Sequence, residues 1–178
     1  MEVGIFLDRD GVINEVLTRR VKFVNKPSDF YLLNGVGEAI KKLNEASYKV
    51  FVVTNQGGIG LGYMRETALE SVHQKMMDDL AEFGAHIDDI SYCPHKPHEG
   101  CVCRKPRPQM LLNLAEKHHI DLENSYMVGD RDPDIEAGKK AGTKTVLVGN
   151  REKTISESDL KFKDLLEFVE WLIEGGSQ

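Results

Sequence analysis

Short runs of consecutive apolar residues alternate along the chain with stretches in which apolar residues recur every three or four positions. The first pattern predicts strands that are buried on both faces, and the second predicts amphipathic helices. The predicted strands cover residues 3–7, 48–53, 89–92, 125–128 and 145–148, and the run at 89–92 is the weakest. The predicted helices cover residues 39–46, 69–83, 111–118, 135–141 and 165–172.

This regular alternation of strands and helices predicts an α/β fold. Strands that are apolar throughout belong to a parallel sheet with helices on both faces, so we expect a doubly wound, three-layer, Rossmann-like arrangement. No internal repeat, low-complexity stretch or long linker divides the sequence, and no large insertion suggests a separate cap domain. We therefore expect a single domain over residues 1–178.

Polar residues follow four of the predicted strands. In sheets of this kind ligands bind beyond the carboxyl ends of the strands, so these residues would surround one crevice. They are Asp8 and Asp10 after the first strand, Thr54, Asn55, Gln56 and Gly57 after the second, Arg104 and Lys105 beyond the third, and Asp130 and Asp134 after the fourth.

The aspartates in this set predict a metal site. Carboxylates that converge repel one another unless a cation such as Mg²⁺ holds them, and Mg²⁺ prefers oxygen ligands. Such a metal, with Lys105 and the hydroxyl of Thr54 nearby, would bind a phosphate group. Each feature alone is more often structural, since Asp-x-Asp is common in loops and acidic residues cap helices. Their joint occurrence at successive strand ends favours the phosphate site.

The charge balance narrows the class of partner. The chain has 23 Lys and Arg residues against 29 Asp and Glu, a net charge of -6, which disfavours non-specific binding of nucleic acid. No apolar run approaches the ~18 residues of a membrane span, and the first residues lack the basic start of a secretory signal. We expect a cytoplasmic monomer with no membrane or nucleic-acid partner.

All three cysteines lie within eleven residues, unlike the spread positions of a disulfide framework. With one imidazole, they make a four-ligand set of the kind found in structural zinc sites. The alternative is a loop of free thiols in a reducing cell. Because no ligand position is left open, we expect a structural Zn²⁺ that stiffens this loop. The candidate ligands are Cys93, Cys101 and Cys103, with either His95 or His98.

Four motifs together resemble those of the haloacid dehalogenase superfamily of phosphatases, over residues 3–149. They are FLDRDGV at 6–12, VVTNQ at 52–56, RKP at 104–106, and GD at 129–130 with Asp134. The segments CPH at 93–95 and CVCRKP at 101–106 resemble the zinc-bearing branch, in which the family position favours His95 as the zinc ligand. The resemblance implies a haloacid dehalogenase-like fold and a Mg²⁺-dependent phosphatase acting on a small phosphorylated sugar.

The resemblance also implies roles for the residues at the strand ends. Asp8 would attack phosphorus to form an aspartyl-phosphate, and Asp10 would protonate the leaving group and then activate water. Thr54 and Lys105 would stabilise the equatorial phosphate oxygens. The implied Mg²⁺ ligands are Asp8, the backbone carbonyl of Asp10, and Asp130, with Asp134 in support and Arg131 placed at this site by family position alone.

Substrate contacts are implied at three segments and at Arg104. Within the zinc-bearing branch we expect removal of the 7-phosphate from a heptose 1,7-bisphosphate, and histidinol phosphate is the alternative substrate. The implied contacts are Arg9, Val16, Leu17, Thr18, Arg19, Asn55, Gln56, Gly57 and Arg104. The basic residues Arg19, Arg20, Lys22 and Lys26 are interpreted either as contacts to a second phosphate or as solvated charge.

Three other classes of function remain as alternatives. A nucleic-acid 3′-phosphatase is disfavoured by the acidic charge. A phosphoacceptor signalling domain without enzyme activity also places an aspartate at a strand end, but Asp10 and the Thr54 motif are typical of the phosphatases. A zinc-knuckle binding module would use the cysteine cluster and would have no phosphatase activity.

Overall fold

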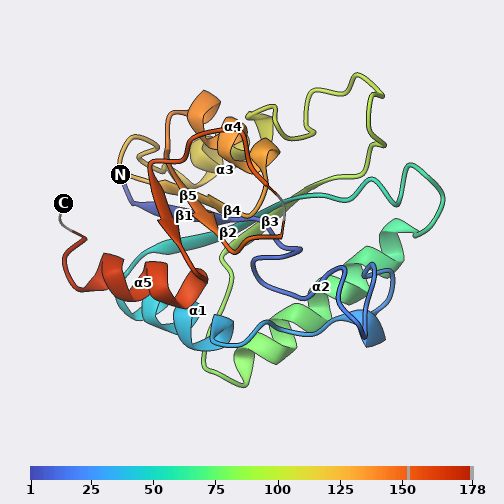
Figure 1. The fold of residues 1–178 in the computed structure, drawn as a ribbon, viewed down its shortest axis with the longest axis horizontal. Coiled ribbons are helices and arrows are strands. Elements are labelled where there is room, and N and C mark those ends of the chain that lie inside the picture. The colour runs from blue at the N-terminus through green and yellow to red at the C-terminus, as the bar shows by residue number, and fades with distance from the viewer. Residues whose placement is uncertain (152, 177–178) are drawn as a thin grey trace.

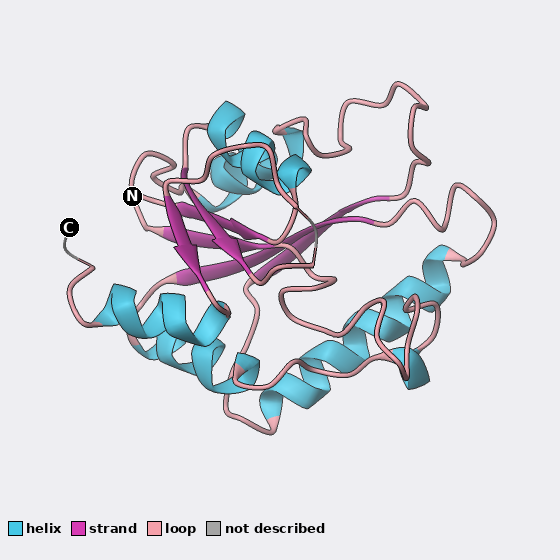
Figure 2. Cartoon of the chain, in the orientation of Figure 1, coloured by secondary structure: helices cyan, strands magenta, loops and turns pink. Residues whose placement is uncertain are grey.

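The computed structural model describes residues 1–151 and 153–176, and it contains a six-stranded sheet. Every strand pairing is parallel, and the order is β3-β2-β1-β4-β5-β6 (Figure 1, Figure 2). The strands are β1 (Gly4–Leu7), β2 (Lys49–Asn55), β3 (Asp89–Cys93), β4 (Tyr126–Gly129), β5 (Lys144–Val148) and β6 (Leu160–Phe162). The helices are α1 (Val36–Glu45), α2 (Glu66–Ala81), α3 (Gln109–His118), α4 (Asp132–Ala141), α5 (Leu165–Ile173) and the 3-10 helix η1 (Pro27–Asp29).

Helices cover both faces of the sheet. In Figure 1, α3 and α4 lie on one face, and α1, α2 and α5 lie on the other. Successive residues of a strand point to opposite faces, so each strand supplies two hydrophobic cores. Ile5 and Leu7 of β1 belong to the core under α1, α2 and α5, whereas Phe6 belongs to the core under α3 and α4. Burial on both faces explains why the strand sequences are apolar throughout.

The predicted fold class is confirmed. Each of the five predicted strands and five predicted helices is present, with ends that differ by at most three residues from the expected ranges. Two elements are not predicted, the edge strand β6 and η1. Each has only three residues, of which none is fully buried, so neither leaves a hydrophobic pattern in the sequence.

The strand order determines where a ligand can bind. The chain moves outward from β1 to β2 and β3, then returns to place β4 on the other side of β1. The connections after β1 and β4 therefore leave in opposite directions, and open α/β sheets bind ligands at such a switch point. Asp8 directly follows β1 and Asp130 directly follows β4, so both lie there.

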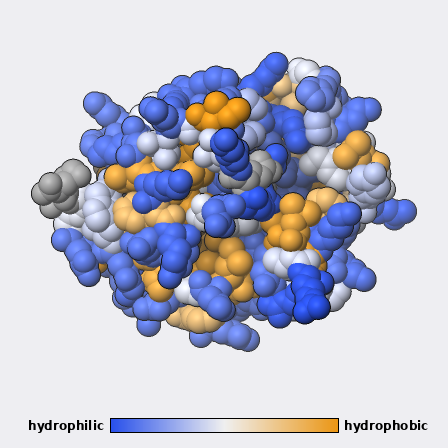
Figure 3. Space-filling view, viewed as in Figure 1, coloured by the Kyte–Doolittle hydropathy of each residue, from blue (hydrophilic) through white to orange (hydrophobic). Residues whose placement is uncertain are grey.

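The connection from β1 to α1, residues 8–35, contains η1, which packs against α2. The face shown in Figure 3 is mostly hydrophilic, with apolar side chains in separate small patches. Among the described residues, no helix is both long and apolar enough to cross a membrane.

Candidate active site

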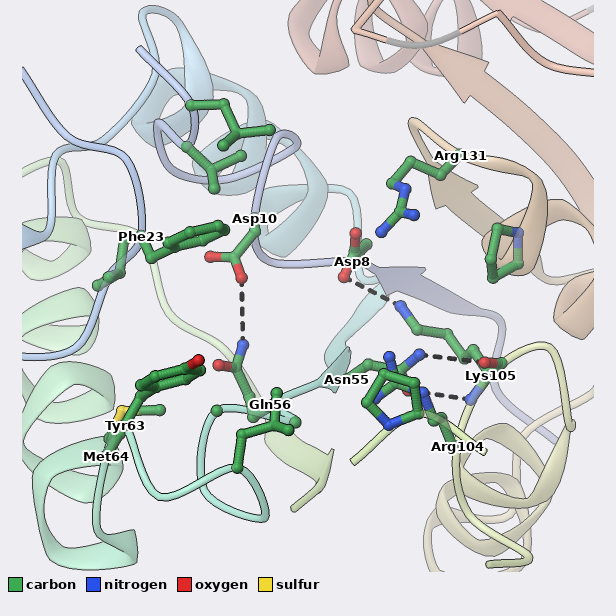
Figure 4. Close-up of a pocket in the computed structure, with 18 of the residues that line it drawn as sticks. Asp8, Asp10, Phe23, Asn55, Gln56, Tyr63, Met64, Arg104, Lys105 and Arg131 are labelled. Atoms are coloured by element: carbon green, nitrogen blue, oxygen red, sulfur yellow. Dashed lines mark hydrogen bonds and ion pairs between the residues drawn. The ribbon is translucent and has the colours of Figure 1, made fainter. Parts of the chain in front are cut away.

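A cavity of about 680 Å³ opens at the carboxyl ends of the central strands, at the predicted switch point (Figure 4). Two further predicted residues, Thr54 and Asp130, are buried and contact the lining residues Gln56 and Arg151. The predicted residues in the lining are Asp8, Asp10, Val16, Leu17, Asn55, Gln56, Gly57, Arg104, Lys105, Arg131 and Asp134.

Three buried carboxylates converge beside this cavity. Asp8, Asp130 and Asp134 each offer an oxygen, and these oxygens all lie within 4.8 Å of one another. Oδ2 of Asp130 has no aligned hydrogen-bond donor among the described residues, although Nε of Arg151 lies 2.8 Å away. A buried carboxylate oxygen without a donor is costly unless a cation satisfies it. The donor set therefore fits a hard divalent cation such as Mg²⁺.

The crowding of these carboxylates changes their protonation. Burial, followed by the charges of Asp134 and Asp10, raises the pKa of Asp8 to about 6, and the charge of Lys105 opposes this rise. Burial, followed by the charge of Asp8, raises the pKa of Asp130 to about 8, with Arg151 opposing. Protons and a metal cation therefore compete for the same oxygens.

Two glycines allow the carboxylates to come this close. A Cβ atom on Gly129 would collide with the side chain of Asp134, and one on Gly11 would collide with Asp130. Gly11 also has a φ of +86°, a conformation that other residues rarely adopt. The glycines after β1 and at the end of β4 are thus part of the architecture of the site.

Lys105 is the buried cation of the site. Its Nζ donates to Oδ1 of Asp8 at 2.9 Å, to Oδ1 of Asp134 at 2.7 Å and to the carbonyl of Val53 at 2.8 Å. Burial acts to lower the pKa of Lys105, but the charges of Asp134 and Asp8 outweigh it and raise the pKa. Asn55 holds the backbone of Lys105 through two hydrogen bonds, of 2.9 and 3.1 Å.

Asp10 is held at the cavity by side-chain donors. Its Oδ1 accepts hydrogen bonds from Nε and Nη2 of Arg9 at 3.1 and 2.8 Å and from Asn14 at 3.0 Å. Its Oδ2 accepts one from Gln56 at 3.3 Å. Burial acts to raise the pKa of Asp10, but the charge of Arg9 and the hydrogen bonds that Arg9 and Asn14 donate hold it below its ordinary value.

Three predicted substrate contacts are not brought into the cavity. Arg9 is fully buried, and its guanidinium faces Asp10 and His73 and not the cavity. Thr18 forms a turn with Val21, and Arg19 is exposed. Among the described residues, the cavity lining also contains none of the other basic residues, Arg20, Lys22 and Lys26.

Two arginines, Arg131 and Arg151, lie near the three buried carboxylates. Arg131 lines the cavity beside Asp8 (Figure 4), but a guanidinium has only donors, so its side chain cannot ligate a metal. Arg151 pairs with Asp130 and is missed by the sequence interpretation. It lies three residues beyond β5, so applying the strand-end rule to the fifth strand would have found it.

The cysteine cluster assembles as a separate site. Sγ of Cys93 lies 2.6 Å from Sγ of Cys103 and 3.6 Å from Sγ of Cys101, and Nδ1 of His95 lies 3.2 Å from Sγ of Cys103. All four ligand atoms lie within 4.8 Å of one another, and the group contains His95 and not His98. Three sulfurs and one imidazole nitrogen form the donor set of a tetrahedral zinc site.

Contacts connect this cluster with the cavity. Nη1 of Arg104 donates to the carbonyl of His95 at 3.1 Å, and the amide of Gly60 donates to the carbonyl of Pro94 at 2.9 Å. Arg104 also follows Cys103 directly in the chain. The conformation of the cluster therefore determines where Arg104 enters the cavity.

One part of the cavity wall is apolar and is missed by the sequence interpretation. Phe23, Leu61 and Tyr63 line it with side chains that remain at least half exposed. These residues lie on irregular loops, where no hydrophobic period marks them.

We expect the Asp130→Asn variant to become more stable relative to the Mg²⁺-free wild type as pH rises from 6.5 to 9. The unfolded Asp130 is ionised throughout this range, whereas the folded carboxyl loses its proton near pH 8. The free energy of unfolding of the wild type therefore falls by about 2 kcal/mol, which lowers its unfolding temperature by ~6 °C, and the variant shows no such fall. Thermal unfolding in buffer without Mg²⁺ measures the difference, and a chelator is omitted because it would also remove zinc from the cysteine cluster.

The pH range is chosen so that His73 does not contribute. Burial and then the charge of Arg9 lower the pKa of His73 to about 3, so this residue reduces stability only below its unfolded value near 6.5. Addition of Mg²⁺ at pH 9 should make the wild type the more stable of the two proteins, because only the wild type retains the full carboxylate set. A pH-independent difference between the two proteins would contradict the assignment.

Comparison with known proteins relates this architecture to a family. A family model described as HAD-hydrolase-like matches residues 102–164. The D-glycero-beta-D-manno-heptose-1,7-bisphosphate 7-phosphatase of Pseudomonas putida is 41% identical over 175 residues, covering 95% of this chain and 98% of its own. The D-glycero-alpha-D-manno-heptose-1,7-bisphosphate 7-phosphatase of Campylobacter jejuni is 36% identical over 171 residues, covering 96% of each.

A solved structure agrees with these relatives. The D,D-heptose 1,7-bisphosphate phosphatase of B. bronchiseptica, crystallised with magnesium and phosphate, superposes with a TM-score of 0.89 at 36% identity and covers 98% of this chain and 99% of its own. Similarity of this kind extends over nearly the whole length of the chain. The chain therefore belongs to the haloacid dehalogenase (HAD)-like family of phosphatases.

Proposed function

We propose that the chain is a Mg²⁺-dependent phosphatase that removes the 7-phosphate of D-glycero-D-manno-heptose 1,7-bisphosphate through an aspartyl-phosphate on Asp8. The observation that carries this proposal is the position of the Asp8 carboxylate, which pairs with the buried cation Lys105 and lies close to the carboxylates of Asp130 and Asp134, at the edge of an open cavity. This is the arrangement that a phosphoryl acceptor needs, because charge on the phosphate must be neutralised while the nucleophile approaches.

The Mg²⁺ ligands are proposed to be Asp8, the carbonyl of Asp10, and Asp130, with Asp134 in support. The ion would neutralise charge on the phosphate and orient it. Asp134 supports the site by accepting the amide hydrogens of Asp130 and Arg131, both at 3.2 Å, and by pairing with Lys105.

Two side chains carry the phosphoryl-transfer step in this proposal. Oδ1 of Asp8 accepts hydrogen bonds from Lys105 and from the amide of Arg9 at 2.9 Å each, which fixes the carboxylate plane. Because its lowered pKa keeps Asp10 ionised at rest, Asp10 must first take up a proton as the substrate binds. As the bond between phosphorus and Asp8 forms, the bond to the ester oxygen breaks and the protonated Asp10 gives that oxygen its proton. Asp10 then removes a proton from the water that hydrolyses the aspartyl-phosphate. The charge of Lys105 and the hydroxyl of Thr54 would stabilise the equatorial oxygens.

The rest of the substrate would contact the cavity wall. Arg104 reaches the cavity from the cysteine loop, and Arg131 from the start of α4, so both can meet the anionic or hydroxyl groups of a sugar phosphate. Val16, Leu17 and Gln56 also line the cavity. We propose a structural Zn²⁺ in the cluster of Cys93, His95, Cys101 and Cys103.

We further propose that residues 1–178 act as one domain and as a monomer in the cytoplasm. The proposed zinc site needs all three cysteines as thiolates, and a reducing compartment keeps them in that form.

The substrate is tested by competition. At equal concentrations, we expect kcat/KM for one anomer of the heptose bisphosphate to exceed that for histidinol phosphate by at least ~10², because the second phosphate gains a charged contact. The Arg104→Gln variant should lose more of kcat/KM with the bisphosphate than with a heptose monophosphate. Equal kcat/KM values for the two substrates would contradict the proposed specificity, and a higher value for histidinol phosphate would assign the chain to that substrate.

A further inference from the structure

Arg9 is the largest fully buried side chain of the described protein, and it carries a charge. It lies in sequence between Asp8 and Asp10, yet it points away from the cavity toward α2. A buried guanidinium costs several kcal/mol of desolvation unless its donors are satisfied, and buried ion pairs in general add little stability over apolar residues of similar volume. Its presence beside the reacting groups therefore calls for a role other than packing.

Three of the Arg9 donors have assigned partners. Nε and Nη2 donate to the same oxygen, Oδ1 of Asp10, at 3.1 and 2.8 Å. Nη1 lies 3.2 Å from Nε2 of His73, in the middle of α2. A guanidinium has no acceptor, so Nε2 of His73 must accept this hydrogen bond and the imidazole must be neutral. The arginine thus joins the Asp10 carboxylate to a helix.

His73 is fixed in turn by its surroundings. It is 7% exposed, and its ring lies 6.2 Å, centroid to centroid, from the ring of Tyr92 on β3. His73 does not line the cavity and so cannot touch a substrate there. Because α2 and β3 are both rigid elements, the imidazole is a stationary anchor for Arg9.

The two oxygens of Asp10 are consequently different. Oδ1 accepts three hydrogen bonds, two from Arg9 and one from Asn14, whose side chain is also buried. Oδ2 accepts one hydrogen bond, at 3.3 Å from Gln56, and lies at the cavity (Figure 4). Rotation of the carboxylate out of this orientation would break the three bonds on Oδ1.

We propose that Arg9 and His73 are positioning residues that lock the Asp10 carboxylate, so that Oδ2 alone transfers the proton to the leaving group. This inference rests on the proposed function, in which Asp10 is the general acid. The proton moves from Oδ2 to the ester oxygen as the bond between the ester oxygen and phosphorus breaks. Oδ1 remains hydrogen-bonded to Arg9 throughout. His73 acts on Asp10 only through Arg9.

The test compares leaving groups in single-turnover experiments. An alkyl phosphate, such as the sugar phosphate, needs protonation of its leaving oxygen, whereas p-nitrophenyl phosphate leaves as a stable anion. In His73→Leu, which removes the acceptor for Arg9, we expect release of the alkyl alcohol to slow by ~10² and release of p-nitrophenol by less than ~3-fold. His73→Gln restores an acceptor oxygen and should recover most of the loss.

Two further variants separate positioning from general destabilisation. Val72→Ala, at the neighbouring buried position of α2, should lower the unfolding temperature and leave the ratio of the two rates at the wild-type value. Arg9→Lys keeps the charge but cannot donate two hydrogen bonds to Oδ1 in the same geometry. It should therefore slow release of the alkyl alcohol more than release of p-nitrophenol. It serves as the test if His73→Leu does not fold.

The outcomes distinguish this inference from the proposed function. Asp10→Asn sets the full effect of losing the acid. Asp10→Asn should slow release of the alkyl alcohol more than release of p-nitrophenol. If it does, and the His73 and Arg9 variants slow both releases equally or slow neither, the positioning role is wrong. If Asp10→Asn itself shows no selectivity for the leaving group, the assignment of Asp10 as the acid is wrong.

Discussion

Asp8→Asn is expected to reduce phosphate release by at least ~10⁴-fold, because an amide of the same shape cannot attack phosphorus. The substitution leaves Lys105 paired with Asp134 and relieves the repulsion among the buried carboxylates, so the variant should fold. Steady-state phosphate release, measured at saturating Mg²⁺ and substrate, gives the loss in kcat.

The control for this variant is Asp78→Asn, the same chemical change at an exposed position of α2 where the side chain contacts only a neighbouring Gln74 in the hydrogen bonds described. It should retain wild-type activity and the wild-type unfolding temperature. If Asp8→Asn kept more than a small residue of activity, Asp8 would not be the nucleophile, and the carboxylate arrangement would need another explanation.

Loss of the cysteine ligands is expected to have the second largest effect. In Cys101→Ser/Cys103→Ser we expect bound zinc to fall from one equivalent to near zero and the unfolding temperature to fall by at least ~10 °C, since structural zinc sites contribute many kcal/mol. kcat/KM should fall with it, because the carbonyl of His95 would no longer hold Arg104. Elemental analysis and thermal unfolding measure the first two effects.

His98→Asn is the matched control for the metal site. His98 lies between the ligands but outside the cluster, and its φ of +62° is one that asparagine tolerates. This variant should retain zinc, stability and activity. Wild-type protein without zinc, or full activity in the double cysteine variant, would contradict the structural role.

The strand ends could be predicted because two strong physical regularities coincide there. Apolar runs fix the strands, and the parallel topology brings their carboxyl ends to one edge, so Asp8 and Asp130 had to approach each other. The choice of His95 over His98 needed the resemblance, because both imidazoles lie within reach of the cysteines along the chain. Geometry then separates them.

The parts that could not be predicted lie mainly on loops, where apolar residues follow no regular spacing. The apolar wall of Phe23 and Tyr63 comes from loops whose path depends on tertiary packing. Arg9 is different, since the alternation that puts Asp8 and Asp10 on one side of an extended chain should have placed Arg9 on the other. Its partner His73 is 64 residues away, and no local pattern connects the two.

Rapid quenching during turnover tests the central claim most directly. Protein mixed with substrate and Mg²⁺, then quenched in acid and digested, should contain a phosphoryl group that hydroxylamine removes, on the peptide that contains Asp8 and on that residue. Its amount should rise and decay as fast as phosphate is released. Full phosphate release with no covalent adduct at any time, or an adduct on a residue other than Asp8, would contradict the account.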